Sequence, residues 1–205
     1  MNPKAVQQLK KIKKLVDIKD KDLRLAAEWS VPWKSLISTI LSSQTRDDTT
    51  ISISKKLYLK YGSLKKLSQA DIKDVKNIIR PVNFYKTKAK HIIQSAKIIV
   101  NEWHGKIPKD RDKLMELPGV GRKVANVYLV HVHKAPAIGV DTHVTYLSQV
   151  LGWTKNKTQV KIERDLEGLF PKKHWNSINY ILVRFGRLYS TRKRQVEKLK
   201  KEGII

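Results

Sequence analysis

The stretch Leu114–His143, which reads LMELPGVGRKVANVYLVHVHKAPAIGVDTH, contains the strongest structural pattern in the chain. Its spacing predicts a short helix over 111–116, a turn, and a second helix that begins at Arg122. Gly119 and Gly121 flank a single valine, and glycine adopts positive φ at little steric cost. Such a turn exposes backbone N–H groups at a helix start, where the helix dipole favours an anion such as phosphate. A purely structural turn has the same local pattern, so the turn alone leaves both interpretations open.

Two residues of this stretch, Lys123 and Asp141, are candidate reactive groups eighteen positions apart. An amine nucleophile must be neutral, whereas an unperturbed lysine has a pKa of about 10.4. The first turn of a helix, the adjacent Arg122 and the apolar neighbours Val124 and Val127 would all favour a neutral amine. Asp141 is also predicted to be the N-cap of the next helix, and capping alone would explain an aspartate at this position.

The charge of the chain indicates a polyanionic partner. Its 205 residues include 43 Lys and Arg but 18 Asp and Glu, a formal net charge of +25. Such a charge favours nucleic acid first and an anionic membrane surface second. No apolar run approaches the roughly 18 residues of a membrane span, and no signal peptide is recognisable. We therefore expect a soluble intracellular protein, in the cytoplasm or nucleoid. The absence of cysteine excludes disulfides, thiol nucleophiles and cysteine-held metals.

Helical periodicity recurs along the chain, and no convincing strand, repeat or linker appears, so an all-α fold is predicted. Asp47 or Asp48 is expected to cap the third predicted helix, and 68–71 to form a capping box for the fourth. Besides the pair around the glycine turn, helices are expected over 2–17, 33–41, 51–60, 68–79, 86–103, 142–151, 158–170, 173–188 and 191–203. The first helix has a basic side, which either is solvated or contacts nucleic acid.

The segments LPGVGRKVANVYL and VDTH closely resemble the helix-hairpin-helix, Gly/Pro-Asp superfamily of DNA glycosylases, in particular its endonuclease III branch. LSSQTRDD (41–48), NFYKTKAKHI (83–92) and HGKIPKDRDKL are similar to the same branch, in the same order and at matching intervals. The resemblance covers roughly residues 25 to 190. It implies two helical domains, one over 25–135 and another built from 1–24 plus 136–205. DNA would bind in the cleft between them, with Lys123 on one wall and Asp141 on the other.

The resemblance also implies roles for individual residues. Lys123 would be the nucleophile and Asp141 its partner, while Gln44 and Phe84 would enter the gap left by a flipped nucleotide. In the family a leucine stands at the position of Phe84 and glycine is usual at Asn83. A core aromatic is the alternative for Phe84, and a polar helix end is the alternative for Gln44. Further DNA contacts are expected from the hairpin and the VDTH segment: Leu117, Gly119, Val120, Gly121, Arg122 and His143.

The function implied is that of a bifunctional DNA glycosylase and AP lyase of base excision repair. It would remove oxidised pyrimidines from duplex DNA and cleave abasic sites by β-elimination through a lysine Schiff base. We expect a monomer that binds damaged or abasic double-stranded DNA and does not bind a membrane. Two alternatives stay open at this point. One is a glycosylase for 8-oxoguanine or for mismatched uracil or thymine, and the other is a non-catalytic helix-hairpin-helix DNA-binding module.

Typical endonuclease III relatives end in four cysteines that bind a [4Fe–4S] cluster. Here Ser190 stands where the first would be expected, and no cluster is predicted. The six histidines show no metal-binding pattern, so no metal site is predicted. A monovalent cation at the main-chain carbonyls of the hairpin, as in relatives, is left open. Residues 191–203 are predicted to form a helix docked on the 2–17 helix, the alternative being a frayed tail.

Overall fold

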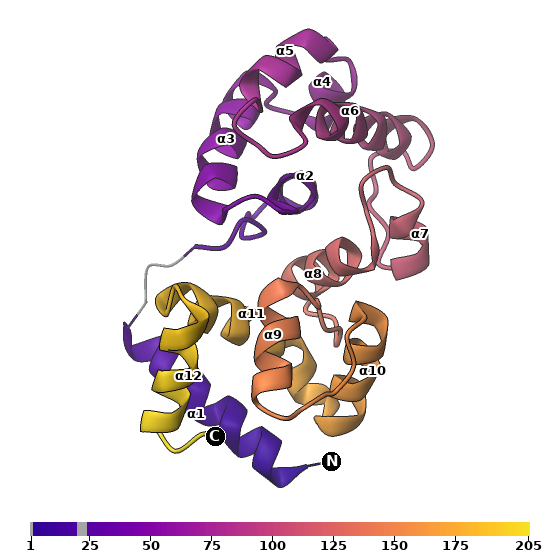
Figure 1. Ribbon diagram of the computed structural model, residues 1–205. Helices are drawn as coiled ribbons and strands as arrows, with labels where there is room; N and C mark the ends of the chain where they lie inside the picture. The colour runs from indigo at the N-terminus through magenta and orange to yellow at the C-terminus, as the bar shows by residue number, and fades with distance from the viewer. Residues whose placement is uncertain (1, 20–23) are drawn as a thin grey trace. The chain divides into compact units, whose positions relative to one another are not determined.

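The computed structural model describes residues 2–19 and 24–205, in two compact units (Figure 1). We call residues 24–133 the central unit, and residues 1–23 with 134–205 the terminal unit. The domain boundaries expected from the sequence, at 24/25 and 135/136, lie within two residues of these. Residues 1 and 20–23, which belong to the expected second domain, lie outside the described residues.

All regular elements in the described part of the chain are helices, so the all-α prediction is confirmed. In order they are α1 (Pro3–Lys19), α2 (Pro32–Ser42), α3 (Asp47–Lys60), α4 (Leu64–Ser68), α5 (Ile72–Ile78), α6 (Tyr85–Asn101), α7 (Arg111–Met115), α8 (Arg122–His133), α9 (Thr142–Val150), α10 (Gln159–Leu169), α11 (Lys172–Leu188) and α12 (Arg192–Lys201).

The central unit is organised around α2, which contacts α3, α6 and α8. Pro32 occupies the first turn of α2, where its missing N–H leaves no intrahelical bond unmade. Residues 35–41 are all buried, including Leu36, Ile37 and Ile40. Because several helices cover α2, it is buried around most of its circumference, and its small polar residues Ser35, Ser38 and Thr39 are buried as well. Its carboxyl end, at Ser42, leads directly into the loop 43–46, which carries Gln44 and which we call the Gln44 loop.

Two details of the central unit differ from the sequence predictions. Neither Asp47 nor Asp48 caps α3; the N-cap position is Arg46, without a side-chain cap, and both carboxylates lie in the first turn. There the helix dipole favours negative charge, and Asp47 Oδ1 accepts a hydrogen bond from the Ala26 N–H at 3.4 Å. The capping box at 68–71 is also wrong. Ser68 ends α4, and Asp71 caps α5 by accepting from the N–H groups of the second and third helical residues.

The terminal unit is built from both ends of the chain. α1 packs on α11, and α9, α10 and α12 complete the cluster. Its core includes Ile12 from the first helix and Leu199 from the last, both fully buried. Polar groups also join the ends, since the Gln8 side-chain amide donates to the Ile204 carbonyl at 2.8 Å and accepts from the Trp153 ring N–H at 2.7 Å. This unit therefore depends on residues nearly 200 positions apart.

The segment after Ser190 is a docked helix, so the frayed-tail alternative is wrong. α12 begins behind a Thr191 cap and buries Gln195 and Leu199. The Gln195 amide donates to the carbonyls of Gly186 (3.0 Å) and Tyr189 (2.8 Å), which ties α12 to the end of α11. The expected contact with the first helix is made by the residues that follow α12, because the Lys11 ammonium donates to the Gly203 carbonyl at 3.1 Å.

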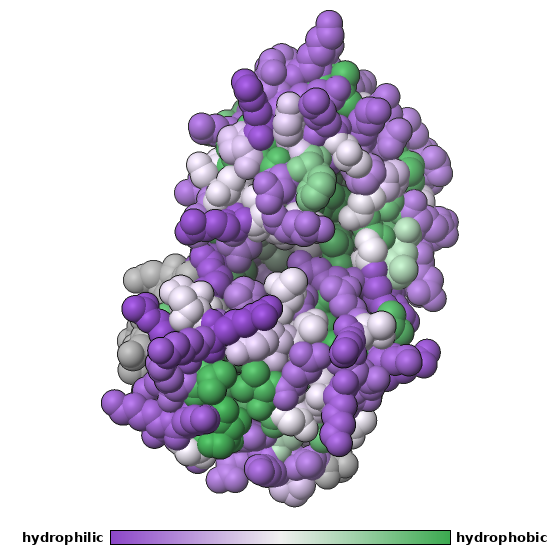
Figure 2. Space-filling view, viewed as in Figure 1, coloured by the Kyte–Doolittle hydropathy of each residue, from purple (hydrophilic) through white to green (hydrophobic). Residues whose placement is uncertain are grey.

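The visible face of each unit is largely hydrophilic (Figure 2), consistent with the lysine-rich composition. Within residues 2–19 and 24–205, no helix combines the length and apolar character needed to cross a bilayer.

Candidate active site and nucleic-acid interface

The turn between α7 and α8 has the geometry of a tight helical hairpin. Leu117 and Val120 are buried and anchor it, and the Val120 N–H donates to the Leu117 carbonyl at 3.0 Å. Gly119 between them has φ 82°. A Cβ on it would lie 2.9 Å from His91 Nδ1 and 3.1 Å from Ile40 Cγ2. Both the backbone angle and the close packing therefore require glycine at this position.

The start of α8 follows this turn directly. Gly121 is exposed, and the chain becomes helical at Arg122, so the first N–H groups of α8 have no intrahelical carbonyl partner. Since the side chains of Leu117 and Val120 are buried, these expected DNA contacts could only be made by the main chain. The hairpin thus presents backbone N–H groups and a positive helix end at one surface.

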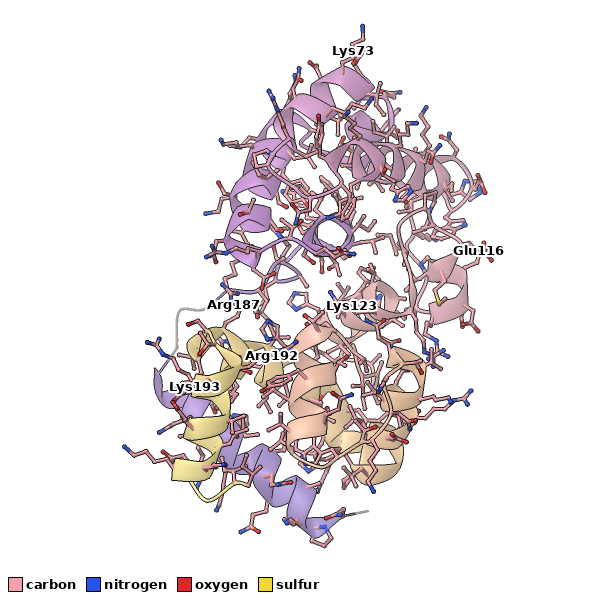
Figure 3. The ribbon with its side chains drawn as sticks, viewed as in Figure 1. Lys73, Glu116, Lys123, Arg187, Arg192 and Lys193 are labelled. Carbon is pink, nitrogen blue, oxygen red and sulfur yellow. The ribbon has the colours of Figure 1, made fainter. Side chains whose placement is uncertain are left out.

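Lys123 lies in the first turn of α8 (Figure 3) and is half-buried. Its neighbours along the helix are Val124, which is buried, and Val127, which is half-buried. A second lysine, Lys88, is close enough to Lys123 for the positive charge of Lys123 to contribute to lowering the pKa of Lys88. Burial is the larger cause, and together the two effects lower the pKa of Lys88 to about 8.

Gln44 and Phe84 lie on two loops of the central unit that are hydrogen-bonded to each other. The Asn83 side-chain amide donates to the Gln44 carbonyl, and the Asn83 N–H donates to Thr45 Oγ1 at 3.2 Å. Phe84 is 64% exposed, so the alternative that it is a core aromatic is wrong. Gln44 is exposed as well. The structure therefore brings these two candidate residues together and directs both outward.

In the terminal unit, Asp141 is the N-cap of α9. Its Oδ1 accepts from the Val144 N–H at 2.9 Å, and its backbone is extended. The segment that precedes it is anchored by Ile138 and Val140, both buried. The cap hydrogen bond uses one carboxylate oxygen, so capping and a catalytic role are chemically compatible.

His143 packs against a glycine of α11. A Cβ added to Gly186 would lie 2.1 Å from His143 Nδ1 and 2.8 Å from its Cε1. α11 therefore has room for the imidazole ring only because residue 186 has no side chain. Gly186 also accepts the hydrogen bond from Gln195, so the ring, α11 and α12 form one packed group.

Across residues 2–19 and 24–205, no group of three or more histidine and acidic residues is arranged to hold a metal ion. The chain also has no thiolate with which to ligate an iron–sulfur cluster. At the position expected for the first cluster ligand, Ser190 is exposed and leads into α12. The residues present therefore do not fit a [4Fe–4S] cluster.

The sequence patterns did not identify two residues of this region, Lys88 and Thr45. Lys88 lies four residues before Ile92, on the buried stripe of α6, and this placement was the available signal. A lysine on an apolar stripe is ordinarily expected to extend its ammonium into solvent. Here the whole side chain is buried, because acceptors at the end of α2 and on the loop that follows it surround its ammonium group.

Comparison with known proteins assigns the family. Residues 37–172 match the model of the HhH-GPD superfamily base excision DNA repair proteins. Endonuclease III of Thermotoga maritima is 41% identical over 156 residues, which cover 76% of this chain and 73% of that protein. Endonuclease III of a Synechocystis species is 36% identical over 161 residues, covering 78% and 74%. A solved structure of a trapped endonuclease III–DNA covalent intermediate is 30% identical, with a TM-score of 0.82 and coverage of 94% and 90%.

The all-helical fold agrees with solved endonuclease III structures over most of the chain. The chain belongs to the HhH-GPD superfamily, and within it to the endonuclease III branch.

Proposed function

We propose that this chain removes oxidised pyrimidines from duplex DNA and cleaves the resulting abasic sites. The broader class, a DNA glycosylase/AP lyase of base excision repair, follows from its similarity to endonuclease III over most of the chain. The observation that supports the residue assignment best is Lys123 in the first turn of the helix after the hairpin. A solved relative is described as a trapped covalent intermediate with DNA, which is the kind of species a nucleophilic lysine would form.

The proposed reaction begins when the damaged nucleotide is flipped out of the duplex, because its sugar carbon is otherwise inaccessible. The neutral Lys123 amine forms a bond to the anomeric carbon while the glycosidic bond breaks and its electron pair leaves with the base. Ring opening then gives a Schiff base. The imine acidifies the neighbouring sugar proton, and loss of that proton with the 3′ phosphate breaks the strand. Water finally releases Lys123.

Lys123 belongs to the central unit and Asp141, the second proposed catalytic group, to the terminal unit. Asp141 would accept the proton from Lys123 and would stabilise the positive charge that develops on the sugar. Capping does not conflict with this task, because the Val144 N–H engages only one carboxylate oxygen of Asp141, Oδ1. Gln44 and Phe84 would occupy the gap in the duplex, Phe84 by replacing lost base stacking with an apolar ring.

The hairpin and the basic surface would supply binding without sequence preference. Backbone N–H groups of Gly121 and Arg122 would hold a phosphate, with His143 on the phosphate side of the terminal unit. We propose that the chain acts as a monomer on the intracellular DNA, in the cytoplasm or nucleoid. We also propose that it works without an iron–sulfur cluster, since it has no cysteine.

A panel of duplexes, each with one lesion, tests the substrate assignment. Thymine glycol and dihydrouracil are expected to be excised with strand cleavage. Duplexes with 8-oxoguanine, or with mismatched uracil or thymine, are expected to be cut much more slowly. Preferential excision of one of those three would replace the oxidised-pyrimidine proposal with a different lesion class. Tight binding with no cleavage of any member, an abasic duplex included, would leave only a DNA-binding module.

A further inference from the structure

Gln44 and Phe84 share an unusual backbone conformation. Their φ angles are 55° and 58°, so both are in the left-handed region. A residue with a Cβ costs roughly 1–2 kcal/mol there, and such conformations persist only where the surroundings enforce them. Gln44 follows the end of α2, and Phe84 immediately precedes α6. Because the same strain occurs at both exposed candidate residues, the contacts beneath the two loops are of functional interest.

One ammonium group lies beneath the Gln44 loop. Lys88 is 6% exposed, and its Nζ donates to the carbonyls of Leu41 (2.7 Å) and Ser43 (2.5 Å) and to Thr45 Oγ1 (3.2 Å). Leu41 lies in the last turn of α2, where carbonyls lack intrahelical partners and the dipole favours a cation. Two of these acceptors, on Ser43 and Thr45, immediately precede and follow Gln44, so they fix the path of its backbone on both sides.

Thr45 joins this arrangement to the second loop. Its hydroxyl oxygen accepts from Lys88 and also from the Asn83 N–H at 3.2 Å, and the Asn83 amide donates to the Gln44 carbonyl. Phe84 is the next residue, and Lys88 lies one helical turn further along α6. The two loops are thus connected in two ways, directly by Asn83 and through the buried ammonium of Lys88.

The burial of Lys88 is costly in itself. All three of its acceptors are neutral oxygens, and burial, with a further contribution from the charge of Lys123, lowers its pKa to about 8. An apolar side chain of similar length would fill the same space without this desolvation cost. The presence of a buried ammonium group at this position is therefore better explained by the hydrogen bonds that it donates to the backbone than by packing.

We infer that Lys88 is a positioning residue that fixes Gln44 and Phe84 in their left-handed conformations, so that both side chains project together into a duplex from which a nucleotide has been flipped. This inference rests on the proposed function, because it assigns a use to the same DNA-contacting pair. Lys88 would act through the loops without touching the reacting atoms. Its contribution would therefore be discrimination between flipped-out and intact duplex.

The test compares Lys88→Met with Lys90→Met, which removes the same charge from an exposed position of α6. Binding is measured to a duplex with a tetrahydrofuran abasic-site analogue and to the intact duplex, with 2-aminopurine opposite the analogue to report insertion into the gap. Relative to Lys90→Met, Lys88→Met is expected to lose about 10-fold of its preference for the analogue, equivalent to about 1.4 kcal/mol. Lys88→Arg should restore most of it.

Two further measurements separate the causes. Borohydride trapping on a single-stranded abasic oligonucleotide, which needs no flipping, should be the same in Lys88→Met and Lys90→Met. A parallel loss there would mean that Lys88 acts through Lys123 and would overturn the positioning role. Should Lys88→Met fail to fold, Thr45→Val removes the shared acceptor and should lower the preference similarly.

An unchanged preference in Lys88→Met, or in Thr45→Val where that variant decides, would overturn the inference. Failure of the unmodified protein to trap on any abasic DNA would instead refute the proposed function itself.

Discussion

Substituting Asp141 separates its two roles, because asparagine caps a helix about as well as aspartate does. In Asp141→Asn the hydrogen bond from the Val144 N–H, 2.9 Å long here, retains an acceptor. The lost negative charge at the helix start costs about 0.3–1 kcal/mol. For a chain of this size, 1 kcal/mol shifts the melting temperature by roughly 2–4 °C. We therefore expect Asp141→Asn to melt within about 4 °C of the parent protein.

Its activity should fall far more than its stability. Loss of a group that accepts a proton and stabilises developing charge typically slows a reaction by about 10² or more. Single-turnover excision from a lesion-bearing duplex measures this rate without interference from product release. Asp141→Ala removes the cap as well, and should lose about 1 kcal/mol of stability in addition to the same loss of rate.

Asp71 provides the matched control. It is also an aspartate N-cap, accepting from Lys73 and Asp74 at the start of α5, and it has no proposed catalytic role. Asp71→Ala should lower the melting temperature about as much as Asp141→Ala and leave excision unchanged. Excision by Asp141→Asn at close to the parent rate would refute the reasoning and reduce Asp141 to a structural cap.

Three other predictions follow from the terminal unit and from the charge. Gly186→Ala should lower the free energy of unfolding by about 1–3 kcal/mol, because its Cβ would meet the His143 ring at 2.1 Å. Gly168→Ala, with nothing within 4 Å of its Cβ, should be neutral or stabilising. Thermal melts of both variants check this, and equal melting temperatures would contradict it. Truncation after Ser190 removes buried Leu199 and Ile204 and should lower the free energy of unfolding by roughly 3–6 kcal/mol. Thermal melting should show this loss, and a DNA titration should show weaker binding. A truncated protein unchanged in both would mean that α12 contributes nothing to either. Duplex affinity should fall steeply with salt, since log K falls by roughly 0.9 per neutralised phosphate, and a fluorescence-anisotropy titration series with a flat slope would exclude a phosphate-dominated interface.

The sequence predicted the long helices because their apolar spacing is local information. The helices over 2–17, 33–41 and 86–103 differ from α1, α2 and α6 by a few residues at their ends. α4 was missed because its five residues, LKKLS, are too few to show a period. The cap expected from Asp47 was wrong for a different reason. Its carboxylate accepts from Ala26, a partner that no local pattern could indicate.

For the candidate site, the sequence predicted where the residues lie in the helices, and their roles stay a prediction. Lys123 and Asp141 were singled out by their segments, and the structure places them at the starts of α8 and α9, respectively. The contacts of Lys88 could not be predicted, because its acceptors lie more than 40 positions earlier, at the end of α2 and on the loop that follows it. A buried lysine becomes recognisable only when the carbonyls around its ammonium are known. The same holds for Gly186, whose importance depends on the ring of a residue in another helix.

The most direct test of the central claim, that Lys123 is the nucleophile, is borohydride trapping on an abasic duplex. The parent protein should form a covalent adduct with DNA, and peptide mass spectrometry should locate it on Lys123. Lys123→Ala should form no adduct while it still binds the duplex, and Lys90→Ala should trap normally. Undiminished trapping by Lys123→Ala, or an adduct on another lysine, would contradict the assignment.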